Sequence, residues 1–345
     1  MLQKLQKDNL IKIKTKFDDL ELYVDDMKKK RKIYISGNHV KPNGSYNCNY
    51  SELETLESMK SISLIAKHKG RHFRDEIERL ENPAYMLRGL KNIINEFDLI
   101  IEQKEILDFG CGSGAFFVNL IKLGASKITG VEINKDLIDI ARSRLNNFDP
   151  EKYSINKIKY INEKNKMSFQ ENKFDIVWAH AVLEHVFPKE RKYVLNDLWR
   201  VTKNGGILIL DALPNRLWIR EIHTTGLLFV NYLPLSLACS IARHFSEKVP
   251  NDQSVEKLLE RGFRGATYWD IKKILPDAIW LNNLNRKADL NAYMKTWLKE
   301  EDNFSKKFIK KLYGMIMSSF DPFLSLIKLP QTAFLPWHFI VLKKQ

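Results

Sequence analysis

Short apolar runs alternate with amphipathic stretches through the middle of this chain. Runs typical of buried strands lie at residues 105–110, 127–133, 157–162, 174–182 and 207–213. Stretches with the apolar spacing of helices lie between them, at residues 115–124, 134–145 and 188–206. Strands that alternate with helices form a parallel sheet covered by helices on both faces. The sequence therefore predicts an α/β fold for this region, which we place at residues 101–213.

Two less regular regions flank this core. Residues 1–100 are predicted to form a helical N-terminal extension, because apolar residues recur at helical spacing from Leu53 to Ile62. Residues 214–345 are predicted to form a helical insertion together with the final strands that complete the sheet. We expect the extension and the insertion to form the acceptor pocket and its lid.

The chain carries a positive balance of charge. It has 56 Lys and Arg against 42 Asp and Glu, which gives a formal net charge of +14. Such a balance is typical of proteins that bind nucleic acids or anionic membranes, and also of a solvated, lysine-rich surface. No compact basic motif stands out, so the sequence favours the solvated surface, and a nucleic-acid partner is not expected.

The spacing of the cysteines and the lengths of the apolar segments indicate the cellular compartment of the protein. Cys48, Cys111 and Cys239 are widely spaced and form no CxxC pair, which favours a reducing cytoplasm over a disulfide framework or a zinc site. The N-terminal stretch has no apolar signal core. The most apolar segment, 226–242, is short for a membrane span and is interrupted by an asparagine and a proline. A cytoplasmic protein is therefore expected, with peripheral membrane contact through this segment left open.

Three glycines directly follow the first predicted strand, at Gly110, Gly112 and Gly114. Glycine permits a tight turn and a close approach of backbone to a ligand, and the next helix points its N-terminus at that turn. Glu132 ends the following strand about 20 residues later, where an acid accepts hydrogen bonds from ribose hydroxyls. The G-x-G-x-G spacing differs from the dinucleotide fingerprint, and the carboxylate of Asp108 beside it suits a cationic ligand. The sequence therefore predicts a cofactor that contains a nucleoside and a cationic group.

Four stretches, ILDFGCGSG, GVEIN, FDIVWAHAVLEHV and LWRVTKNGGILIL, resemble the class I S-adenosylmethionine-dependent methyltransferases in order and spacing. The resemblance covers residues 104–213. It implies a Rossmann-like, mostly parallel sheet with an antiparallel last strand, and S-adenosylmethionine as the cofactor. The cofactor-binding residues that it implies are Asp108, Gly110, Gly112 and Gly114 at the methionine part, Glu132 at the ribose with Ile133 beside it, Glu163 at the adenine, and Ala179 and His180 along the other side. Glu163 departs from the aspartate found there in many relatives.

Methyl transfer needs an aligned acceptor and, for a hydroxyl acceptor, a base that takes its proton. His180, His185 and His223 are the candidate bases, although the LEHV motif around His185 is also common as a structural feature. Some quinone-pathway O-methyltransferases hold a divalent metal with acids and a histidine in this region. Glu184 and His185 match that pattern in type, but Ala181 stands where a further acid belongs, so no metal site is expected.

Residues 213–234 also resemble methyltransferases of bacterial glycan and cell-envelope biosynthesis. The expected function is methyl transfer, most simply to oxygen, on a small-molecule, sugar or envelope lipid-linked acceptor. An RNA or other N-methyltransferase is the enzymatic alternative, although the Asn/Asp-Pro-Pro-aromatic signature of many such enzymes is absent. A non-catalytic scaffold or sensor that binds S-adenosylmethionine is the alternative from another class.

Overall fold

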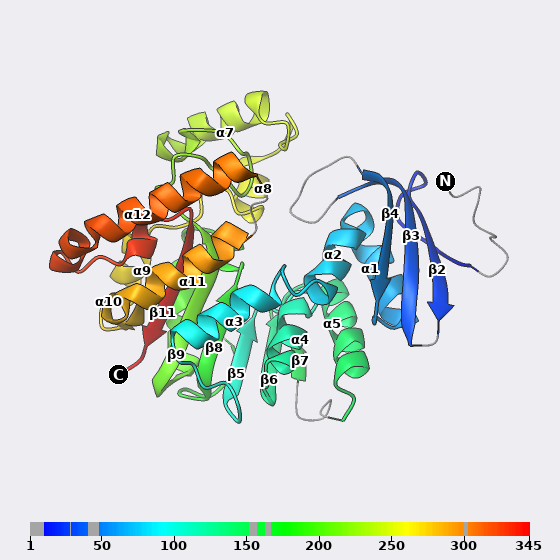
Figure 1. The fold of residues 1–345 in the computed structure, drawn as a ribbon, viewed down its shortest axis with the longest axis horizontal. Coiled ribbons are helices and arrows are strands. Elements are labelled where there is room, and N and C mark those ends of the chain that lie inside the picture. Colours follow the sequence, from blue (N-terminus) through cyan, green and yellow to red (C-terminus); the bar gives the residue numbers. More distant parts are fainter. Residues whose placement is uncertain (1–9, 28, 41–47, 152–156, 163–166, 300–302) are drawn as a thin grey trace. The chain divides into compact units, whose positions relative to one another are not determined.

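A computed structural model describes residues 10–27, 29–40, 48–151, 157–162, 167–299 and 303–345 (Figure 1). The chain is divided into two compact units. The first unit comprises residues 1–91 and 111–163, and the second unit comprises residues 92–110 and 164–345. Across the described ranges, every helix is too short or too polar to cross a membrane.

The first unit begins with a four-stranded antiparallel sheet. Its strands, in spatial order, are β1 (Ile11–Ile13), β2 (Glu21–Met27), β3 (Lys30–His39) and β4 (Cys48–Thr55). Leu22 and Val24 of β2 and Ile33 and Ile35 of β3 are fully buried, with the period of two that a half-buried strand requires. They join one core with the helices α1 (Met59–Lys69) and α2 (Phe73–Glu81).

This sheet corrects the prediction of a helical extension over residues 1–100. The apolar spacing from Leu53 to Ile62 combined a strand residue with helix residues, because Leu53 lies on β4. The helix itself starts after Ser58, which has extended backbone angles and whose side chain accepts a hydrogen bond from the Ser61 N–H. Within the described residues, the extension therefore has strands up to Thr55 and helices only beyond it.

The rest of the first unit has the strand–helix alternation that the sequence predicted. It contains η4 (Gly70–His72), α4 (Ala115–Lys122), β6 (Lys127–Glu132), α5 (Lys135–Phe148) and β7 (Lys157–Tyr160). Asn134 caps α5 by accepting hydrogen bonds from two backbone N–H groups of its first turn. The helix α3 (Leu87–Glu96) runs across the boundary between the units.

The central sheet has seven strands in the order β10-β11-β9-β8-β5-β6-β7. Its strands from the second unit are β5 (Glu105–Phe109), β8 (Phe174–His180), β9 (Thr202–Pro214), β10 (Ile279–Trp280) and β11 (Trp337–Lys343). The pairs β5–β8, β8–β9 and β6–β7 are parallel, whereas β11 is antiparallel to β9 and β10 is antiparallel to β11. The predicted mostly parallel sheet with an antiparallel last strand is thus confirmed.

A long, mainly helical insertion separates β9 from β11, as predicted. The helices of the second unit are η5 (Leu183–His185), α6 (Arg191–Val201), η6 (Val230–Tyr232), α7 (Leu235–Phe245), α8 (Val255–Glu260), α9 (Tyr268–Ile274), α10 (Leu281–Leu284), α11 (Arg286–Lys299), α12 (Phe304–Leu326) and η7 (Gln331–Phe334). Of the final strands predicted in this region, β10 is only two residues long, because α10 begins directly after it. The apolar segment 226–242 is divided between η6 and α7, and its Val230, Ala238 and Cys239 are buried in a core of the insertion.

Candidate active site

The glycine-rich loop is tied to the strand β6 within the first unit. The Cys111 N–H donates to the Val131 carbonyl at 3.0 Å, and the Gly112 N–H donates to Oε2 of Glu132 at 2.9 Å. Gly112 has φ +53°, and a side chain there would meet nothing within 4 Å. The backbone at Gly112 therefore borders open space, which leaves room for a ligand that contacts the backbone closely.

Glu132 is buried at the end of β6 and organises the turn that follows it. Its Oε1 accepts hydrogen bonds from the Ile133 N–H at 2.9 Å and the Asn134 N–H at 3.0 Å. Together with the Gly112 contact, these use three of the roughly four lone-pair directions of a carboxylate, so capacity remains for a hydroxyl donor. An open pocket of about 460 Å³ lies beside it, lined by Ile133, Asn134, Lys135 and Asp136.

Asp108 and Gly110 lie at the end of β5 in the second unit. Asp108 is buried and lies beside Trp178 of β8 in the parallel register. Gly110 has φ +73°, and a Cβ at this position would lie 2.5 Å from Cγ2 of Val182. Glycine is required here both for its backbone angle and for the close approach of the chain after β8.

His180, the last residue of β8, forms a pair with Asp211, which lies in the last third of β9. They are register neighbours, and Nδ1 of His180 lies 2.9 Å from Oδ2 of Asp211. The other oxygen, Oδ1, accepts a hydrogen bond from Trp178 Nε1 at 3.0 Å. A carboxylate that accepts from Nδ1–H leaves Nε2 of the imidazole as the basic nitrogen. This arrangement supplies a base on an edge of the sheet where ligands bind.

The residue after each partner of this pair has a left-handed backbone. Ala181 has φ +52° and Ala212 has φ +54°, which alanine adopts only at some cost in energy. The Ala181 N–H also donates to the Asp211 carbonyl at 3.0 Å. β8 thus ends directly before a strained residue, and β9 contains one within the strand, opposite the register shift in β11, as is common beside functional groups.

The other two candidate bases, His185 and His223, lie together with Glu184 in a second cluster. Burial raises the pKa of Glu184 to about 8, and the charge of Asp211 acts in the same direction. Burial also lowers the pKa of His223 to about 4, and the neighbouring His185 adds to that effect. The neutral forms of both groups are therefore favoured near neutral pH.

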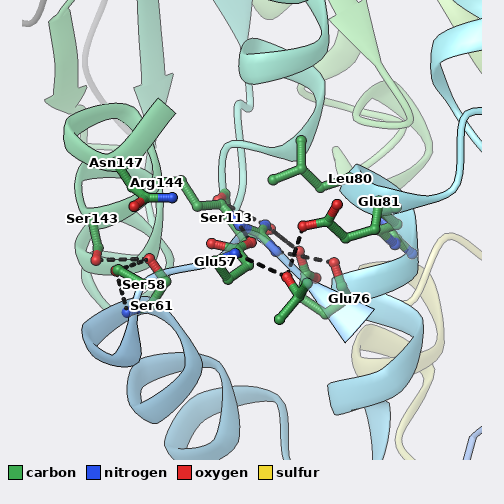
Figure 2. A network of polar contacts seen from close by, with 12 residues as sticks. Glu57, Ser58, Ser61, Glu76, Leu80, Glu81, Ser113, Ser143, Arg144 and Asn147 are labelled. Atoms are coloured by element: carbon green, nitrogen blue, oxygen red, sulfur yellow. Dashed lines mark hydrogen bonds and ion pairs between the residues drawn. The ribbon is translucent and has the colours of Figure 1, made fainter. Parts of the chain in front are cut away.

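A buried network anchors the glycine-rich loop to the N-terminal extension within the first unit. Figure 2 shows the Arg144 guanidinium, on α5, at its centre. Arg144 donates to Glu57 Oε1 at 2.6 Å through Nε, and to Glu76 Oε1 at 2.6 Å and Ser113 O at 3.1 Å through Nη1. Ser113, between the second and third glycines of the loop, also donates its hydroxyl to Glu76. The extension therefore fixes the conformation of the loop in addition to any part in the acceptor pocket.

Opposing effects act on the acids of this network. Burial alone would raise the pKa of Glu76, but the charges of Arg144 and Lys69 hold that pKa far below its usual range. For Glu57, burial outweighs Arg144, and its pKa is raised. One guanidinium thus serves two buried carboxyl groups, and its loss would leave both without a buried cation.

Sequence reasoning singled out the glycine-rich loop and the acids at the ends of β5 and β6, but it missed several residues that support them. Asp211 could have been found, because it is the single acid within the apolar run ILILDAL. A buried strand tolerates such an acid only when its carboxylate has a hydrogen-bond or ion-pair partner. Glu221 gave no such signal, although its buried carboxylate accepts hydrogen bonds from the backbone of His223 and Thr224. Arg144 gave no signal either, because its position in the sequence is the same as that of an exposed cation on an amphipathic helix. Glu163, predicted at the adenine, lies outside the described residues.

Comparison with known proteins identifies the central region. A family described as "Methyltransferase domain" matches residues 107–210. The chain contains a class I methyltransferase domain. Methyltransferase domains of this class use S-adenosylmethionine as their cofactor.

Individual relatives match this methyltransferase domain and part of its surroundings. A ubiquinone biosynthesis O-methyltransferase of Hydrogenovibrio crunogenus is 32% identical over 33% of this chain and 44% of its own length. One from Coxiella burnetii is 29% identical over 46% of this chain and 67% of its own length. A solved S-adenosylmethionine-dependent methyltransferase of Methanosarcina mazei is 31% identical over 36% of this chain and 58% of its own, with a TM-score of 0.32. The match to the first relative thus spans less than half of its length.

Proposed function

We propose that this protein transfers a methyl group from S-adenosylmethionine to a hydroxyl of a small-molecule, sugar or envelope lipid-linked acceptor in the cytoplasm. The observation that carries the choice of oxygen is the His180–Asp211 pair, because a hydroxyl acceptor gains from a base of this kind. The names of the two ubiquinone biosynthesis O-methyltransferases support the same choice. Cys111 and Cys239, both buried as thiols, are consistent with a reducing compartment.

The residues at the two strand ends fit S-adenosylmethionine by their chemistry. The cofactor supplies a methyl group on a positively charged sulfonium. The buried carboxylate of Asp108 suits the cationic methionine part, and the open backbone at Gly112 suits its close approach. Glu132 has remaining acceptor capacity for the ribose hydroxyls, and the exposed side chain of Ile133 lines the adjacent pocket. Ala179 and Glu163 keep their predicted places along the cofactor as part of this proposal.

Glu132→Ala is expected to weaken the binding of S-adenosylmethionine by more than tenfold, or about 1.4 kcal/mol. The change removes the acceptor for the ribose and also frees the Gly112 N–H that fixes the loop. Calorimetric titration measures the affinity. Glu132→Gln, which keeps one oxygen acceptor, should lie between the wild type and the alanine variant. Equal affinity for wild type and Glu132→Ala would refute the assignment of Glu132 to the ribose.

A lipid-linked acceptor is supported by the exposed face of α12. This 23-residue helix packs on the second unit through Gly314, Met317 and Leu324. Its outer face exposes large apolar side chains: Phe304, Phe308, Ile309, Leu312, Met315, Ile316, Phe320, Phe323 and Leu326. Lys306, Lys307 and Lys311 are exposed along the same helix. An amphipathic helix with apolar and basic side chains of this kind binds in the interface of an anionic bilayer.

We therefore expect peripheral binding to vesicles that contain phosphatidylglycerol, at the face formed by α12. Reversing Lys306, Lys307 and Lys311 to Glu should reduce the bound fraction in a sedimentation assay at least tenfold, since each lysine near such a surface contributes about 1 kcal/mol. Lys60, Lys67 and Lys91 are exposed on other helices, and their reversal changes the net charge equally. An equal decrease of the vesicle-bound fraction in both triple variants would show that net charge alone determines binding. It would contradict a docking face at α12.

Transfer of a labelled methyl group tests the proposed function directly. Purified protein and S-adenosylmethionine labelled on its methyl group are offered lipid, polysaccharide, small-metabolite, RNA and protein fractions. Label in the first three fractions, stable as an ether, is the expected result. Label in RNA or on nitrogen would replace the proposal with the N-methyltransferase alternative. Binding of the cofactor with no transfer to any fraction would favour a scaffold or sensor.

A further inference from the structure

Glu184, His185 and His223 gather three metal-ligating side chains in the second unit that the roles above leave unused. Their ligand atoms all lie within 4.8 Å of one another. Oε1 of Glu184 is 3.9 Å from Nε2 of His185 and 3.9 Å from Nε2 of His223, which is too long for a hydrogen bond. Ligands at about 2.1 Å from one tetrahedral metal ion lie roughly 3.4 Å apart. The two distances from Glu184 exceed this separation by about half an ångström, so a small inward movement of the side chains would bring them to coordinating distances.

Glu184 has the environment expected of a ligand that lacks its ion. Its side chain is fully buried on η5, and within the described part of the chain neither of its carboxylate oxygens has a hydrogen-bond partner. A buried carboxyl group without a donor is costly, and in folded proteins such groups are normally paired or bound to a metal. The Nε2 atoms of His185 and His223, each 3.9 Å from Oε1, also lie beyond hydrogen-bond distance.

Hydrogen bonds on the far side of both imidazoles orient Nε2 of each toward Glu184. Nδ1 of His185 lies 2.7 Å from the Glu260 carbonyl, which can only accept, so Nδ1 carries the proton. The Thr224 hydroxyl donates to the Arg261 carbonyl at 3.0 Å and accepts from Nδ1 of His223 at 3.3 Å. Both Nε2 atoms therefore carry a lone pair. Such outer hydrogen bonds are characteristic of metal-binding histidines.

The surrounding backbone is shaped for this cluster. Gly262, just after α8, has φ +86°, and a Cβ there would lie 2.7 Å from the His223 ring and 3.1 Å from Cγ of Glu184. Glu221 fixes the loop that carries His223 through its backbone hydrogen bonds. Arg191 fixes the turn that carries Glu184, donating to the carbonyls of Val186 and Glu184.

We propose that Glu184, His185 and His223 bind one divalent transition-metal ion of the zinc type. Two imidazoles and one carboxylate suit such an ion better than Mg²⁺, which prefers oxygen ligands. The His185 side chain is 45% exposed, so an outside ligand can reach the ion from that side. A ligand set of three protein groups and an open position is typical of catalytic sites. If the proposed function holds, the open position takes the acceptor hydroxyl and lowers its pKa.

Metal binding is tested without reference to methyl transfer. The full-length protein, stripped with a chelator, is titrated calorimetrically with Zn²⁺, and with Co²⁺ while its visible absorption is recorded. One ion per chain is expected, with a visible Co²⁺ spectrum of low coordination number and no comparable binding of Mg²⁺. His223→Ala and the more exposed His185→Ala should each weaken Zn²⁺ binding at least a hundredfold, and Glu184→Gln should do the same. His244→Ala is the matched control, because His244 is an exposed histidine of α7 bonded only to the Ser240 carbonyl in the described contacts.

Two kinds of result would overturn the site. The first is an absence of stoichiometric Zn²⁺ binding in wild type that circular dichroism shows to be folded. The second is binding that His185→Ala and His223→Ala leave unchanged, or that His244→Ala weakens equally. Failure of methyl transfer with intact metal binding would count against the proposed function and leave the metal site standing. Retained binding of S-adenosylmethionine in His185→Ala would confirm that a loss of metal there is not a loss of fold.

Discussion

Asp211→Asn is expected to lower kcat for methyl transfer by about 10²- to 10⁴-fold, the range that general-base catalysis contributes. Trp178 donates its indole N–H to Oδ1, so an amide at this position would turn its oxygen to Trp178 and its NH2 group to His180. The NH2 group cannot accept a hydrogen bond from Nδ1–H of His180. The imidazole proton would then move to Nε2, which could no longer accept the proton of an acceptor hydroxyl.

Steady-state kinetics and the pH–rate profile check this result together. Asp211 acts through His180 as a positioning residue, so its loss should lower kcat and change the shape of the pH–rate profile, while the Kd for S-adenosylmethionine changes little. Asp175→Asn is the matched control, since Asp175 lies near the start of β8, the strand that carries His180, and accepts a hydrogen bond from the Glu105 N–H. Turnover of Asp211→Asn within threefold of the control would contradict the assignment. A His180→Ala, Asp211→Asn double variant should be no slower than His180→Ala alone.

Arg144→Met should lower the free energy of unfolding by about 3 to 5 kcal/mol, the usual cost of breaking a buried ion pair on one side. Methionine replaces most of the volume of the side chain but leaves the buried carboxyl groups of Glu57 and Glu76 without their shared cation. The loss should be smaller at pH 5 than at pH 8. Burial already raises the pKa of Glu57 against the opposing effect of Arg144. Without Arg144 that pKa lies further above its unfolded value, so protonation of Glu57 at low pH restores stability that is lost as the pH rises.

Urea unfolding at the two pH values measures this effect. Arg142→Met is the matched control on the same helix, because Arg142 is exposed and bonds only the Ile158 carbonyl in the described contacts. Its expected cost is below about 1 kcal/mol. Nearly equal stability of the two variants would show that Arg144 is not essential to the network. The Arg144 variant should also bind S-adenosylmethionine more weakly, because Ser113 loses a fixed partner.

The glycine-rich loop after β5 and the acid at the end of β6 were predictable because their signals are local. Tight backbone turns require glycine at Gly110 and Gly112, and an acid at a strand end such as Glu132 follows a fixed spacing from them. The parallel core was predictable for a related reason: each strand and helix is a continuous run whose apolar period is visible in the sequence.

The remaining features depend on contacts between distant residues. His223 meets Glu184 only because the insertion after β9 folds back on η5, and no local pattern encodes that approach. The N-terminal sheet was missed because the spacing of Leu53 and Ile62 resembles that of a helix, although one belongs to a strand and the other to a helix. Pairing with β3 decided the structure of β4, and such tertiary preference overrides local propensity.

The Arg144 network also has a consequence for the order in which the chain folds as it is made. Arg144 follows Glu57 by 87 residues and Glu76 by 68. At the usual 5 to 20 residues per second, roughly 3 to 17 seconds pass between synthesis of the acids and synthesis of their cation. During that interval α1 and α2 cannot complete their native packing, because the carboxylates of Glu57 and Glu76 must stay hydrated until Arg144 can pair with them. The N-terminal sheet and its helices therefore reach their final structure only after α5 has been synthesised.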